Sequence, residues 1–136
     1  KLLYITENDI MELNELIHNL FQLECKLFMK MDSYYLIEQK CKKKCLNAFE
    51  RQMLNTEIRY AFTYLIKIMM EACPSLTEED LLFCCLGKLG LNNQLIGRCM
   101  GCVNKQPINQ RKYRVKKKIK EAKCESFFEF ILLPIL

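Results

Sequence analysis

Apolar residues recur every three or four positions along most of the chain, which is the spacing of one face of an α-helix. The first run covers residues 4–44 and predicts a long helix with Asn8 or Asp9 as its N-cap. Asp32-Ser33 interrupts this run, so residues 34–44 are expected to form a second, shorter helix. Such spacing is typical of a helix that packs along a partner helix, in the same chain or in another subunit.

A second run covers residues 46–73 and is expected to end before Pro74, because a proline inside a helix clashes with the preceding turn. Glycine (4) and proline (3) are scarce, and no strand-like alternation of apolar and polar residues occurs. We therefore predict an all-α fold that begins with long helices, arranged as a helical hairpin or a coiled coil. For residues 1–73 as a whole we predict a role in dimerisation.

Residues 74–136 are predicted to contain several short helices. Thr77 is expected to cap the first, with Asp80 completing a capping box and Gly90 following its C-terminal end. Asn92 or Asn93 then caps a helix that ends before Gly101. An apolar helix near the C-terminus is expected to pack back on the domain or into a dimer contact, through Phe127, Phe128, Phe130, Ile131 and Leu132.

A basic helix is predicted between these elements, over about residues 105–122. The stretch from Lys105 to Lys123 holds nine Lys and Arg against one acid, Glu121, in a chain whose net charge is +5. Asn104 is the expected N-cap, and Pro107 lies in the first turn, where a missing N–H costs nothing. Charge concentrated in this way is the electrostatic footprint of a nucleic-acid contact.

This basic helix divides into an apolar stripe and a polar face. Ile108, Val115 and Ile119 are spaced by seven and four, so they lie on one side. The remaining amides, guanidinium, phenol and ammonium groups suit hydrogen bonds to base edges and contacts to phosphates. The predicted base contacts are Gln106, Asn109, Gln110, Tyr113 and Arg114. The predicted phosphate contacts are Lys105, Lys116, Lys117, Lys118 and Lys120.

Two stretches resemble the LuxR/FixJ-type helix-turn-helix class: CPSLTEEDLLFCCLGKLGL, continuing through NNQLIG, and INQRKYRVKKKI. More closely, they resemble the C-terminal domains of bacterial transcriptional regulators with an N-terminal tetratricopeptide-repeat sensor and a coiled helical segment. The resemblance covers about residues 46–132. It implies a four-helix DNA-binding domain, placed here over 74–136, that usually works as a dimer. Gly97 stands where the class has alanine, and the turn between Ile96 and Ile108 is one residue longer.

The nine cysteines lie within apolar helical patterns, so we expect free thiols in a reducing cytoplasm and no disulfide scaffold. Two pairs, Cys41 with Cys45 and Cys99 with Cys102, could supply four thiolates to a tetrahedral zinc ion. Neither pair is predicted to lie in the loop typical of structural zinc, and Cys99 is needed in an apolar helix face. We therefore expect no metal and no other cofactor.

An enzyme is not expected. His18 is the only histidine, and no second group at a defined spacing accompanies it. A glycine-rich phosphate loop is also missing from the sequence. We accordingly predict no small-molecule substrate.

The sequence thus predicts a sequence-specific DNA-binding transcriptional regulator, or its output fragment, with the basic helix in the major groove of double-stranded DNA. We expect a homodimer in the cytoplasm, either free or as the cytoplasmic part of a membrane-anchored protein, with an upstream sensor region outside this fragment. The alternative is a helical protein–protein interaction module whose basic face is only solvated. Asn109, Gln110 and Arg114 on one surface favour DNA. Membrane-surface binding is disfavoured because the apolar stripe is narrow and has no Trp or Phe.

Overall fold

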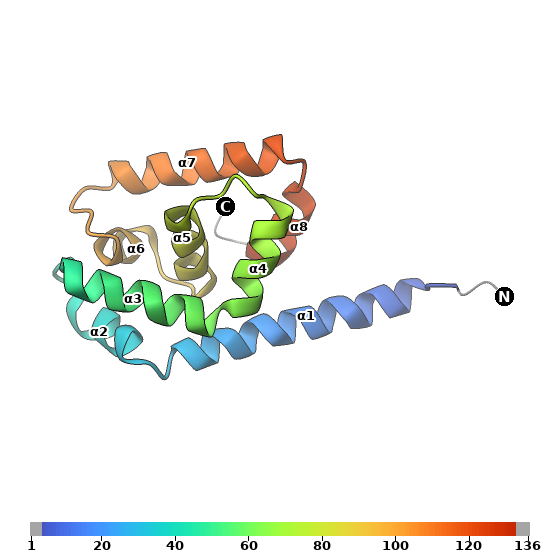
Figure 1. The fold of residues 1–136 in the computed structure, drawn as a ribbon, viewed down its shortest axis with the longest axis horizontal. Helices are drawn as coiled ribbons and strands as arrows, with labels where there is room; N and C mark the ends of the chain where they lie inside the picture. Colours follow the sequence, from blue (N-terminus) through green and yellow to red (C-terminus); the bar gives the residue numbers. More distant parts are fainter. Residues whose placement is uncertain (1–3, 133–136) are drawn as a thin grey trace.

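Residues 4–132, with side chains up to Phe130, are described by a computed structural model, which has eight helices and no strand in this range (Figure 1). The all-α prediction is confirmed. The helices are α1 (Glu7–Phe28), α2 (Asp32–Lys40), α3 (Ala48–Ala61), α4 (Thr63–Ala72), α5 (Glu78–Lys88), α6 (Asn93–Cys99), α7 (Gln106–Glu121) and α8 (Glu125–Leu132).

Helix α5 forms the centre of the molecule. Every residue from Asp80 to Gly87 is buried, and α5 packs against α3, α4, α6, α7 and α8. The surrounding core is continuous and includes Phe21 and Phe28 of α1, Phe62 between α3 and α4, and Phe128 of α8. The core therefore runs across the boundary predicted between residues 73 and 74, while the dimerisation role of the first segment stays a prediction.

The sequence signals around α5 and α6 are confirmed. Thr77 and Asp80 form the predicted capping box. The Asp80 nitrogen lies 3.1 Å from the Thr77 hydroxyl oxygen, and the Thr77 nitrogen lies 3.0 Å from an Asp80 carboxylate oxygen. The Asn92 side chain accepts a hydrogen bond from the backbone N–H of Leu95 (2.9 Å), which starts α6. Gly90 follows α5 with φ +85°, in the left-handed region that favours glycine.

Two predicted N-caps are wrong. Helix α1 starts after Thr6, not at Asn8 or Asp9, because the Thr6 hydroxyl accepts from the Asp9 N–H while the Asp9 carboxylate accepts from the Thr6 N–H. Helix α7 starts after Lys105, not Asn104, and no side chain caps its first turn. The free N–H groups of that turn therefore face solvent or a ligand.

The predicted helix over 46–73 is two helices, because the chain breaks at Phe62, where φ is −102° and ψ is 34°. Helix α4 has no local cap. Instead, the buried Glu24 carboxylate of α1 accepts hydrogen bonds from the backbone N–H groups of Tyr64 (2.9 Å) and Leu65 (3.1 Å). Burial raises the pKa of Glu24, and the two N–H groups partly offset that effect. One helix thus caps another.

Helix α2 begins in the same manner. It starts at Asp32, within the predicted interruption, and ends at Lys40, four residues before the predicted end at 44. No side chain of its own caps it. The Glu57 carboxylate of α3 accepts from the backbone N–H of Ser33 at 2.8 Å. Helices α2 and α4 are therefore each capped by a glutamate distant in sequence.

The N-terminal half of α1 extends beyond the rest of the molecule (Figure 1). The C-terminal half is anchored by Phe21 and Phe28, which are fully buried. Farther out, Ile10, Leu13 and Leu16 are 50, 57 and 64 % exposed. Despite these apolar residues, none of the helices between residues 4 and 132 has the length and apolar character needed to cross a membrane.

Candidate nucleic-acid interface

Helix α7 lies at the surface with its apolar stripe turned inward. Ile108, Val115 and Ile119 are 2, 0 and 3 % exposed, as their spacing predicts. Helices α5, α6 and α8 pack beneath this stripe, and Pro107 occupies the first turn. The opposite side of a 16-residue helix is therefore presented to solvent.

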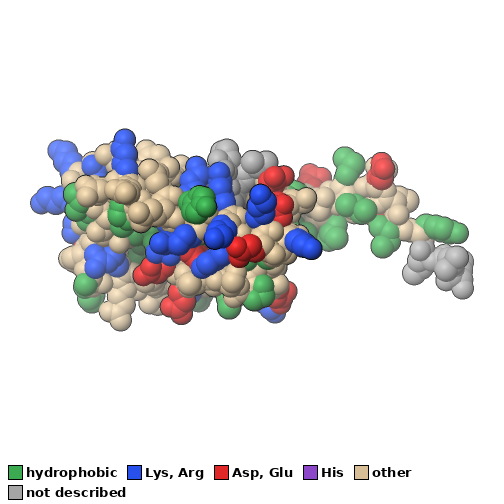
Figure 2. All heavy atoms as spheres, turned by 90° about the horizontal axis from the view of Figure 1, so that it is seen from above, with side chains coloured by type: hydrophobic (Ala, Val, Ile, Leu, Met, Phe, Trp, Pro, Cys, Tyr) green, Lys and Arg blue, Asp and Glu red, His purple; other side chains and the backbone are tan. Residues whose placement is uncertain are grey.

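All predicted base contacts lie on this outer side. They are exposed in every case: Gln106, Asn109, Gln110, Tyr113 and Arg114. Tyr113, at 68 % exposure, packs against little of its own protein. Figure 2 shows Lys and Arg side chains gathered on the face that carries α7, with some acidic side chains between them. The structure thus brings amides, a phenol and a guanidinium together on one cationic surface.

The predicted phosphate contacts divide into two groups. Four are exposed and make no ion pair in the described residues: Lys105, Lys116, Lys117 and Lys120. Lys118 differs, because its ammonium nitrogen lies 2.6 Å from an Asp80 carboxylate oxygen and its side chain is 27 % exposed. Lys118 therefore stabilises the fold, and we remove it from the set that would contact DNA.

Asp80 attaches α7 to α5. Its side chain is 1 % exposed, and its Oδ1 accepts from the Arg111 guanidinium at 2.8 Å. Oδ2 accepts from the Lys118 ammonium at 2.6 Å and from the Thr77 backbone N–H at 3.0 Å. A second Arg111 nitrogen donates to Glu79 at 2.6 Å. Two cations of α7 thus converge on one buried carboxylate.

The electrostatics of this cluster favour the charged form of Asp80. Burial by itself would raise the pKa, but the hydrogen bonds from Lys118, the Thr77 backbone and Arg111 outweigh it and lower the pKa of Asp80 to about 2. The same carboxylate helps to raise the pKa of Arg111, against the effect of burial. Asp80 is therefore charged at neutral pH, and its ion pairs with Arg111 and Lys118 attach α7 to α5.

A glycine permits close approach of α6 to α7. A Cβ atom on Gly97 would lie 3.3 Å from Cγ1 of Ile108, tighter than an ordinary contact. The Gly97 carbonyl also accepts from the backbone N–H of Cys102 at 2.7 Å, which closes the turn after α6. Gly101 in that turn has φ +78°. The glycine that replaces the expected alanine thus lies at the contact between the two helices.

Comparison with known protein families, curated proteins and solved structures finds no match. The functional interpretation therefore depends on the geometry of the α5–α7 region and on its charge.

The two cysteine pairs meet beside the C-terminal end of α6. The Cys41 and Cys99 sulfurs are 4.0 Å apart and fully buried, and the Cys45 thiol donates to the Cys102 carbonyl at 3.6 Å. Cys41 and Cys45 are not on the helix predicted over residues 34–44, because α2 ends at Lys40 and both cysteines lie in the segment that follows it. Even so, no three His, Cys, Asp or Glu side chains in the described part of the chain are arranged to hold a metal ion.

Proposed function

We propose that this protein is a sequence-specific DNA-binding regulator that places α7 in the major groove. The observation that carries the proposal is the division of α7 into a buried apolar stripe and an exposed face with all five candidate base-reading side chains. In this proposal α5, α6 and α7 act as a helix-turn-helix of the LuxR type, and α8 is the fourth helix of that domain.

The exposed side chains suit separate tasks in such a complex. Gln110, Asn109 and Arg114 can form paired hydrogen bonds with base edges, and each good pair contributes about 1–3 kcal/mol of discrimination against a wrong base. Ammonium groups on the flanks suit phosphates, which set affinity without reading sequence. The inner cations Arg111 and Lys118 are already paired with carboxylates and hold α7 in place.

The first test is a selection of bound duplexes from a random pool, followed by fluorescence anisotropy on a selected duplex at increasing salt. Four phosphate contacts predict that the logarithm of affinity falls against the logarithm of salt concentration with a slope of about −4. A palindromic selected site would indicate a dimer. No binding to any duplex at low salt would refute the proposal.

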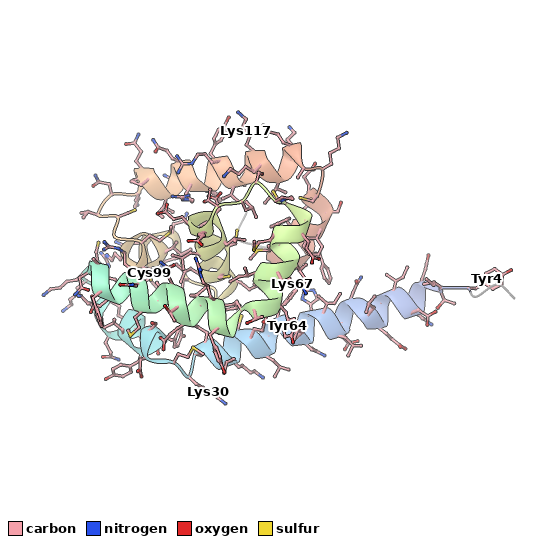
Figure 3. The ribbon with its side chains drawn as sticks, viewed as in Figure 1. Tyr4, Lys30, Tyr64, Lys67, Cys99 and Lys117 are labelled. Carbon is pink, nitrogen blue, oxygen red and sulfur yellow. The ribbon has the colours of Figure 1, made fainter. Side chains whose placement is uncertain are left out.

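Substitutions then separate base reading from charge. Arg114→Ala should relax the preference at one position of the site, whereas Lys117→Ala should weaken all duplexes alike and make the salt slope shallower by about 1. Lys30→Ala and Lys67→Ala are matched controls, because both lysines are exposed and lie away from the outer face of α7 that carries Lys117 (Figure 3). Equal losses for Lys67→Ala and Lys117→Ala would mean that α7 has no special role.

A second candidate function is a protein–protein interaction module, and the exposed apolar residues of α1 favour it. In that case the basic face of α7 would serve only solubility or an acidic protein. Sedimentation with and without duplex DNA separates the two functions, because only a DNA-binding protein changes its sedimentation coefficient when the duplex is added at low salt.

A further inference from the structure

Helix α1 carries a second apolar stripe that its own fold leaves open. Its five leucines are spaced by three, four, three and four residues, which is the heptad spacing of a coiled-coil seam. They are Leu13, Leu16, Leu20, Leu23 and Leu27. At about 100° per residue, this stripe lies roughly a third of a turn from the core-facing residues Phe21, Cys25 and Phe28. The leucine stripe is therefore separate from the face that attaches α1 to the domain.

Four of the five leucines have no partner within the described residues, whereas Leu20 is partly buried against the core. Leu13, Leu16, Leu23 and Leu27 are 57, 64, 61 and 41 % exposed, although leucine is among the residue types most often buried. Helices α3 and α4 pack on the core-facing side, and on another side the His18 ring contacts the Phe130 ring of α8 in a tilted arrangement, with ring centroids 4.3 Å apart.

The charges along α1 indicate which occupant fits the stripe. The N-terminal half carries only acids, namely Glu7, Asp9, Glu12 and Glu15. The exposed charge of the C-terminal half is Lys26, and Lys30 follows in the turn after the helix. Glu24 is buried and used to cap α4. A second α1 in antiparallel orientation would place an acidic half beside each basic half, whereas a parallel copy would place like charges side by side.

We infer that two copies of this protein form a homodimer in which their α1 helices pack antiparallel along the leucine stripe. With Leu16 opposite Leu20 of the partner subunit, Leu13 lies opposite Leu23 of the partner subunit. Glu12 and Lys26 occupy the flanking position of the heptad, so Glu12 lies beside Lys26 of the partner subunit, and the contact occurs twice by symmetry. The inference concerns α1 alone and does not depend on DNA binding by α7.

Sedimentation velocity on the 136-residue chain over a range of concentrations tests the dimer without DNA. The Leu16→Glu/Leu23→Glu double variant should weaken association at least about a hundredfold, because it places charges in the middle of the seam. Met11→Glu is the matched control, since Met11 is 66 % exposed but lies off the stripe. Circular dichroism melts show whether each variant is folded. A chain that stays monomeric at all concentrations, or a Met11→Glu variant that dissociates equally, would overturn the inference.

Charge reversal tests the orientation. Glu12→Lys and Lys26→Glu should each weaken the dimer by about tenfold, because each replaces two attractive contacts with two repulsive ones. The combined Glu12→Lys/Lys26→Glu variant restores both contacts and should return to the original dissociation constant. In a parallel pair the single reversals would leave that constant unchanged, so this result would exclude the antiparallel arrangement. Loss of DNA binding with an intact dimer would refute only the proposed function.

Discussion

Replacing Asp80 by asparagine tests whether the buried carboxylate holds α7 in place. The Asp80→Asn change keeps the size of the side chain and an oxygen that can accept from the Thr77 N–H, so the capping hydrogen bond can persist. It removes the charge that Arg111 and Lys118 share. Both cations would then remain close to the protein interior without a buried counter-ion, which is the costly outcome of breaking such a pair.

The magnitude follows from the pKa. Asp80 titrates at about 2 in the folded protein against an ordinary value of 3.8, and this difference corresponds to about 2 kcal/mol of folding free energy. Because the folded-state pKa is lowered, the stabilisation is complete above about pH 5 and is lost as pH falls through the range between the two values. At pH 3 about half of it should remain.

The assay is urea unfolding followed by circular dichroism, for the parent and the Asp80→Asn protein, at pH 7, 5 and 3. The expected difference in unfolding free energy is about 2–3 kcal/mol at pH 7, shrinking by about half at pH 3. Glu79→Gln is the control, because Glu79 binds the same arginine from a 70 % exposed position and should cost at most about 1 kcal/mol. An Asp80→Asn difference below about 0.5 kcal/mol, or one that does not depend on pH, would refute the reasoning.

Three further outcomes follow from the packing and the caps. Glu24→Ala should destabilise the protein by about 2–4 kcal/mol in the same urea assay, because it removes the acceptor of the Tyr64 and Leu65 backbone N–H groups, while Glu24→Gln should cost less. Gly97→Val should destabilise by about 1–3 kcal/mol and Gly97→Ala by less than about 1 kcal/mol, because a Cβ alone requires only a small shift of Ile108 and the larger side chain requires a larger one. A chelator should leave the melting temperature unchanged, since no metal-binding group is formed among the described residues. A fall of several degrees on chelation would indicate a zinc site at the cysteine pairs.

Local signals in the sequence were sufficient for two features of α5 and α7. The capping box of Thr77 and Asp80 joins residues three apart, and the stripe of Ile108 and Val115 follows from helical periodicity alone, so both could be predicted. The break at Phe62 could not, because it depends on a carboxylate 40 residues away in sequence. Apolar residues continue through the break at helical spacing, so the sequence pattern resembles one continuous helix.

The assignment of roles within the basic helix shows the same limit. Nine basic residues in one segment predicted a cationic surface, but the sequence gives equal weight to each lysine. Arg111 and Lys118 are seven apart, so they share one side, and that side borders the apolar stripe of Ile108 and Val115. This spacing was the available signal that both cations face inward. It could not identify Asp80 as their common partner, because that contact joins residues 31 and 38 positions apart.

The division of the basic residues of α7 into inward-facing and outward-facing ones also matters for DNA recognition. A recognition helix has to be attached firmly to its own domain, and its outer face has to stay free to contact DNA. The cations of one helix can meet both requirements only if some lie on the inner side of the helix and others on the outer side. Arg111 and Lys118 meet the first need through Asp80, and the exposed lysines are left for the second. Lys118→Ala should therefore lower the free energy of unfolding and leave the salt slope of DNA binding unchanged. Lys117→Ala should leave the free energy of unfolding unchanged and make the salt slope shallower. A salt slope that falls by the same amount in both variants would show that Lys118 leaves Asp80 and contacts phosphate when DNA binds.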